Sequence, residues 1–80
     1  VPSTVSIYPN PATNVISFTS SLNAAAVEVF DIAGRKVGAF EMRGNAVTIE
    51  LSSFSTGMYI YNVVNEKKEV INRGKFEVTK

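Results

Sequence analysis

Few side chains in this 80-residue chain could do acid–base or nucleophilic chemistry, because it has no histidine and no cysteine. A catalytic carboxylate needs a partner for proton transfer, and the acidic residue nearest to Asp31 in the sequence is Glu28. Residues three apart on a strand point to opposite faces, so these two carboxylates cannot work as a pair. No serine, lysine and carboxylate set is spaced to build a nucleophilic site. We therefore expect no enzyme activity.

Patterns that bind metals or phosphates are also missing from the sequence. Zinc sites draw mainly on Cys and His, and the acidic residues do not cluster as a calcium loop requires. The glycines are scattered instead of forming a phosphate-cradling loop. They are Gly34, Gly38, Gly44, Gly57 and Gly74. We expect no cofactor.

The charge balance argues against two classes of partner. Eight Lys and Arg against seven Asp and Glu give a formal net charge of +1, too small to attract nucleic acid or an anionic membrane by its overall field. No apolar run approaches the roughly 18 residues that a membrane span needs. We expect neither nucleic-acid binding nor membrane insertion.

Apolar residues recur at every second position through most of the chain, which is the period of a strand with one buried face. Turn-forming residues separate these runs at intervals of roughly 8 to 12 residues, as in antiparallel sandwiches. The pattern predicts an all-β fold, a seven-stranded antiparallel immunoglobulin-like β-sandwich, formed by a single domain over residues 1–80. The apolar positions of the expected strands are Val5/Ile7, Ile16/Phe18, Val27/Val29, Val37/Ala39, Val47/Ile49/Leu51, Tyr59/Tyr61/Val63 and Phe76/Val78.

A proline-rich segment, Tyr8-Pro9-Asn10-Pro11, follows the first expected strand. Each proline fixes φ, lacks an N–H donor and disfavours helical backbone at the residue before it. We interpret the segment as a stiff crossover between the first two strands, with Tyr8 packed at the edge.

Two further motifs predict how strands are joined. Asp31 offers a side-chain acceptor at the start of a turn, and Gly34 allows a positive φ three residues later, which predicts a hairpin with a bulge. Gly57 and Tyr59 open an alternating strand, where Tyr59 is expected to form a tyrosine corner. In that corner the hydroxyl bonds a backbone group a few residues upstream.

The last six residues predict an amphipathic strand. Phe76 and Val78 share one face, and Lys75, Glu77 and Thr79 share the other. The plain interpretation is a closing strand with one buried side.

These motifs, in this order, resemble the C-terminal sorting domains of the bacterial type IX secretion system (type A, Por secretion family). The resemblance implies a signal that directs a larger cargo protein across the outer membrane, followed by proteolytic removal and by surface attachment or release of the cargo. The implied partners are the outer-membrane translocon and its shuttle components, a sortase-like signal peptidase and an N-terminal passenger domain. The implied route leads to the periplasm, then to the outer-membrane surface or the extracellular space.

The resemblance also assigns roles to residues. Recognition by the translocon is expected at the terminal strand, through Gly74, Lys75, Phe76, Val78 and Lys80. The other motif residues are expected to hold the scaffold that presents this strand. They are Tyr8, Pro9, Asn10, Pro11, Asp31, Gly34, Gly57 and Tyr59.

Two other functions fit the same residues. An immunoglobulin-like or fibronectin-like accessory module would bind carbohydrate or an adhesive partner through a solvent-facing row of rings, for which Tyr8, Phe40 and Tyr61 are the candidates. A purely structural spacer would need no signal at its C-terminus.

Overall fold

The computed structural model describes residues 5–9, 12–20 and 24–80, and all regular structure in this part of the chain is β-strand. The strands follow the runs of alternating apolar residues. They are β1 (Val5–Tyr8), β2 (Val15–Ser20), β3 (Ala26–Asp31), β4 (Lys36–Glu41), β5 (Ala46–Glu50), β6 (Gly57–Val64) and β7 (Val70–Val78). The prediction of an all-β fold with seven antiparallel strands is confirmed.

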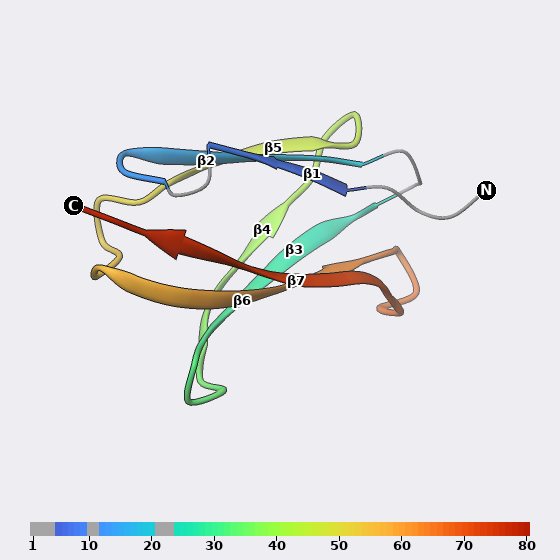
Figure 1. Ribbon diagram of the computed structural model, residues 1–80. Helices are drawn as coiled ribbons and strands as arrows, with labels where there is room; N and C mark the ends of the chain where they lie inside the picture. The colour runs from blue at the N-terminus through green and yellow to red at the C-terminus, as the bar shows by residue number, and fades with distance from the viewer. Residues whose placement is uncertain (1–4, 10–11, 21–23) are drawn as a thin grey trace.

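The strands form two sheets that lie one above the other (Figure 1). One sheet has three strands in the order β1-β2-β5, and the other has four in the order β4-β3-β6-β7. Every ladder within them is antiparallel. The last residues follow directly after the outer strand β7, at the opposite end of the sandwich from the start of β1 (Figure 1).

The core lies between the two sheets, because the inward-facing residues of their strands are apolar. Phe76 of β7 is its aromatic centre, with its ring centroid 6.0 Å from that of Phe18, 5.6 Å from Tyr59 and 6.4 Å from Tyr61. The fully buried side chains around these rings are Ile16, Val27, Val29, Ile49, Leu51, Val63 and Val78.

Strand β7 begins at Val70, earlier than its apolar pattern indicates. Asn72 and Gly74 occupy positions on the same face as Phe76, so the alternation is weak in this half of the strand. Pairing with β6 continues through it nevertheless, with Gly74 opposite Tyr61. Hydrogen bonding to β6 therefore starts the strand at Val70, before the alternating apolar residues begin.

Strand β4 carries a bulge against β3. Gly38 lies opposite Val29, but Lys36 lies opposite the next residue, Phe30, so Val37 is the additional residue.

Within the described residues there is no helix with the length and apolar character needed to cross a bilayer.

Candidate recognition surface

The terminal strand β7 is an outer strand of the four-stranded sheet, and its side chains divide sharply between core and solvent. Phe76 is 1% exposed and Val78 is 0% exposed. Lys75 precedes Phe76, Glu77 lies between Phe76 and Val78, and both charged residues are exposed. Two of the five residues expected to be recognised by a translocon thus turn their side chains into the core of the folded domain.

Gly74, also expected to take part in recognition, has a packing role. A Cβ atom there would lie 2.6 Å from the Tyr61 hydroxyl oxygen and 2.7 Å from the ring carbon that carries it. The Tyr61 ring cannot easily withdraw, because it packs edge-on against Phe18 with centroids 5.0 Å apart. Burial also raises the pKa of the Tyr61 phenol. A glycine at position 74 lets this ring lie directly against the backbone of β7.

The side chain of Lys80 is bound within the domain. Its ammonium group donates to the carbonyl oxygen of Leu51 at 2.6 Å and lies 3.4 Å from that of Ser52. The Leu51 carbonyl also accepts from the N–H of Phe54, so it anchors the turn that leads toward β6. Lys80 therefore fastens the end of the chain to the β5–β6 connection.

Ala12, in the connection between β1 and β2, bonds to the same end of β7 along the outer edge of this strand. The N–H of Ala12 donates to the carbonyl of Glu77, and its carbonyl accepts from the N–H of Thr79, each at 2.8 Å. Ala12 is fully buried. Tyr8 is 54% exposed instead of packed at the edge as predicted, and it precedes Pro9 in a cis peptide bond. Asn10 and Pro11 lie outside the described residues.

The bonds to Ala12 also show which backbone groups of β7 point outward. In an antiparallel ladder, alternate residues turn their N–H and C=O toward the same neighbour. Because Glu77 and Thr79 face Ala12, the backbone groups of Lys75 point to the same outer side. The side chain of Lys75 is exposed as well.

Asp31 is a turn residue, as predicted. Its Oδ1 atom accepts from the N–H groups of Ala33 and Arg35 at 3.0 and 2.9 Å, and Oδ2 accepts from Arg35 Nε at 3.1 Å. Gly34 has φ +88° and donates its N–H to the Asp31 carbonyl. The backbone N–H of Arg35, assisted by its guanidinium, holds the pKa of the Asp31 carboxyl below its usual value. The other carboxylate, Glu28, is bound separately by Lys36 at 3.3 Å.

The predicted tyrosine corner is present. Gly57 opens β6, and two residues later the Tyr59 hydroxyl donates to the carbonyl of Ser55 at 2.8 Å. The Tyr59 ring stacks on Phe76 and meets Phe54 edge-on. Tyr59 thus links the β5–β6 connection, through Ser55, to the part of the core that Phe76 of β7 fills.

A model of the family described as the secretion system C-terminal sorting domain matches residues 6–75 of this chain. The chain belongs to this family. Membership identifies a type IX secretion sorting signal, which implies interaction with the secretion machinery, attachment to a larger cargo protein and export across the outer membrane to the cell surface or beyond. A comparison with curated proteins gives no match.

A solved structure supports the fold of the sorting domain. The chain is similar to part of PorZ, an essential bacterial surface component of the type IX secretion system of Porphyromonas gingivalis, with a TM-score of 0.78 and 19% identity. The match covers 95% of the sorting domain and 11% of the PorZ chain. At this identity the likeness bears on the fold alone.

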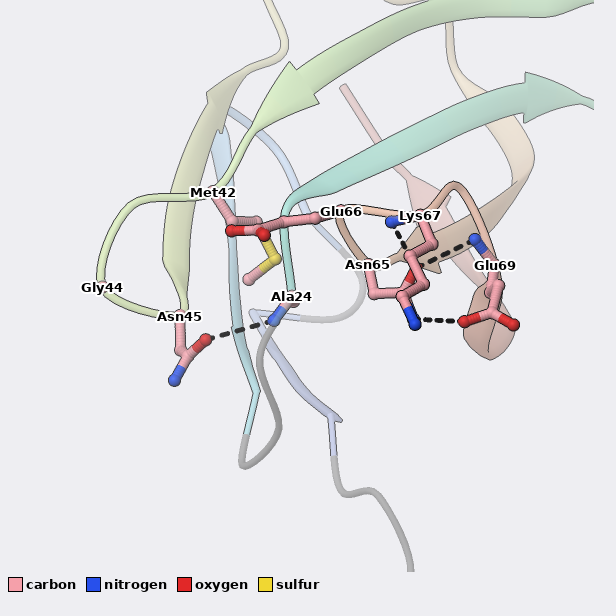
Figure 2. Close-up of a pocket in the computed structure, with 8 residues that line it drawn as sticks. All are labelled: Ala24, Met42, Gly44, Asn45, Asn65, Glu66, Lys67 and Glu69. Carbon is pink, nitrogen blue, oxygen red and sulfur yellow. Dashed lines mark hydrogen bonds between the residues drawn. The ribbon is translucent and has the colours of Figure 1, made fainter.

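The sorting domain has an open pocket of about 580 Å³ between the β4–β5 turn and the β6–β7 turn (Figure 2). Its amide side chains already have hydrogen-bond partners within the domain. Asn45 Oδ1 accepts from the N–H of Ala24, and Asn65 Oδ1 accepts from those of Lys67 and Glu69. Among the described residues, no three acidic, His or Cys side chains gather as a metal site. Asn65 therefore holds the β6–β7 turn, and Asn45 ties the β4–β5 turn to the segment before β3.

The three rings considered for carbohydrate binding do not form a row. Tyr61 is 6% exposed, and Phe40 packs against the core from β4. Tyr8 is exposed, but it belongs to the other sheet. The feature that would favour an accessory carbohydrate-binding module is therefore not built from these residues.

Proposed function

We propose that this domain is a folded secretion signal that presents its terminal strand to the type IX machinery, and that it is itself not an enzyme. The observation that carries the proposal is the family match over residues 6–75. The geometry of β7 agrees with it, because the strand lies at a sheet edge with the backbone and side chain of Lys75 directed outward. An edge strand can pair with an extended segment of a partner.

The remaining expected recognition residues act through this presentation. Phe76 and Val78 fix the strand to the core, Gly74 seats it against Tyr61, and Lys80 fastens its end to Leu51. In this proposal Lys75 and the backbone edge contact the machinery, and the other four residues set the position and shape of the contact.

The proposal extends to the route. The cargo reaches the periplasm, engages the outer-membrane translocon and shuttle components through this domain, and crosses the outer membrane. A sortase-like signal peptidase then removes the domain, and the cargo is attached to the surface or released.

The order of strands in the two sheets and the tyrosine corner at Tyr59 support an immunoglobulin-like class for the sandwich.

The experiment is export of a reporter in a type IX-competent bacterium. A periplasmic reporter fused to residues 1–80 is compared with the same reporter fused to residues 1–74. The full fusion should be found outside the cell, and the truncated fusion should stay in the periplasm. Equal export of both would favour a spacer without a terminal signal, and saturable NMR shifts on titration with sugars would favour the accessory module.

A further inference from the structure

The outer face of the four-stranded sheet has an apolar centre. Phe30 of β3 lies directly opposite Ile60 of β6, and Met58 is two residues from Ile60 on the same face of β6. Because Val29 and Tyr59 point into the core, these three residues point away from it. Met58 is 40% exposed, and Phe30 and Ile60 are half-buried. We refer to Phe30, Met58 and Ile60 as the outer apolar patch.

The adjoining β3–β4 hairpin carries two more exposed apolar residues. Ile32, in the turn directly after β3, is 74% exposed, and Val37, the bulge residue of β4, is 43% exposed. Their exposure lets them contact a partner without any rearrangement of the core.

The outer face of the other sheet is more polar at its centre. Its central row carries hydroxyl groups, and Ser17 Oγ lies 3.1 Å from Thr48 Oγ1 across β2 and β5. Ser6 and Thr19 face each other in the row beside them. Tyr8 at 54% and Val15 at 39% are also exposed on this sheet, beside the hydroxyl row. Exposed apolar residues scattered singly need no explanation, but an adjacent group such as the outer apolar patch marks an interaction surface.

The charges around the outer apolar patch indicate the chemistry of its partner. Lys75 lies opposite Ile60, so the row Phe30–Ile60–Lys75 leads from the patch to the terminal strand. Lys36 is paired with Glu28 at 3.3 Å, whereas Lys75 has no ion pair within the part of the chain that the structure describes. Glu77 lies opposite Met58 on the same face, so the border of the patch along β7 carries one acidic and one basic side chain. An acidic group on the partner would complement Lys75.

We propose that the outer face of the four-stranded sheet is the docking surface for the type IX machinery, whose complementary protein surface has an apolar centre and an acidic group opposite Lys75. This inference rests on the proposed function and deepens it. The occupant is the machinery because the patch is continuous, through Lys75, with the edge of β7 that it is proposed to engage. One partner surface can thus cover both the sheet face and the strand edge.

The test uses the reporter fused to residues 1–80, with Ile60→Lys and Met58→Lys as patch variants and Thr48→Lys as the matched control on the other outer face. We expect at least a tenfold loss of exported reporter for each patch variant and no change for the control. Lys75→Glu should reduce export strongly, and Lys75→Arg should retain it. Thermal denaturation of each purified domain checks that the patch variants remain folded.

Folded patch variants that are exported as well as the wild type would overturn the inference. Equal losses for Thr48→Lys and Ile60→Lys would overturn it as well. A wild-type domain that is dimeric by light scattering and becomes monomeric with Ile60→Lys would assign the face to a second copy instead. Retention of the wild-type fusion in the periplasm is a separate result, because it would contradict the proposed function itself.

Discussion

The ammonium group of Lys80 lies 2.6 Å from the carbonyl oxygen of Leu51, although the two residues are 29 positions apart in the sequence. The final side chain of the domain therefore closes a contact between the end of β7 and the connection that follows β5. A basic residue at this position stabilises the fold by holding these two segments together.

Replacing Lys80 by Met removes the donor and keeps an apolar stem of similar length. A hydrogen bond from a charged group contributes about 1.5 to 3 kcal/mol, and we expect a loss near the lower end of this range because Lys80 is exposed. Urea unfolding of the isolated domain measures the free energy. The control, Lys67→Met in the exposed β6–β7 turn, should stay within about 0.5 kcal/mol; equal effects of both variants would contradict the clamp.

Gly74→Ala should destabilise the domain, because the new Cβ would lie 2.6 Å from the Tyr61 hydroxyl oxygen in a packed aromatic core. Overpacking of this kind costs about 1 to 3 kcal/mol, and each kcal/mol lowers Tm by roughly 4 to 8 °C in a domain of this size. The comparison is Gly38→Ala, whose Cβ would meet the half-buried Phe40 ring at 3.1 Å. Thermal denaturation followed by circular dichroism should show the larger fall for Gly74→Ala, and the opposite order would argue against the packing role.

Tyr59→Phe should cost about 1 to 3 kcal/mol, because it leaves the Ser55 carbonyl without the hydroxyl that it accepts from in the tyrosine corner. Tyr61→Phe is the matched control in the same strand, since the described residues include no hydrogen bond to its hydroxyl. The two variants remove the same atom from neighbouring inward positions. A loss of stability for Tyr61→Phe as large as for Tyr59→Phe, measured by chemical unfolding, would be inconsistent with the corner.

Asp31 should make stability depend on pH in the acid range. Its folded-state pKa is lowered, chiefly by the N–H of Arg35, so the unfolded chain binds the proton more readily. The resulting stability is present above the unfolded pKa of about 3.9 and is lost as pH falls through the folded pKa. The unfolding free energy of Asp31→Asn should therefore fall less steeply than that of the wild type below about pH 4. Identical pH profiles would count against this role.

Local chemistry in the sequence predicts part of this fold well. The period-two pattern locates the seven strands, because one buried face requires alternation. The Asp31 and Gly34 pair predicts its own turn, since the acceptor and the positive φ lie within a few residues of each other. The spacing of Gly57 and Tyr59 similarly predicts the corner.

Contacts between distant segments escape such reasoning. The need for glycine at position 74 depends on the Tyr61 ring in the neighbouring strand β6. The partner of Lys80 is the carbonyl of Leu51, 29 residues away in the sequence. The outer apolar patch depends on the order of strands, which places Phe30 against Ile60. The sequence pattern marks these residues as strand positions, but only the pairing of the strands brings them together.

Recognition of this domain by the type IX machinery can be measured directly. The most direct measurement compares the reporter fused to residues 1–80 in a type IX-competent strain with the same fusion in an otherwise identical strain that lacks the outer-membrane translocon. Recognition predicts reporter on the surface or in the medium of the first strain and in the periplasm of the second. Reporter that stays in the periplasm of both strains, or leaves both equally, would contradict it.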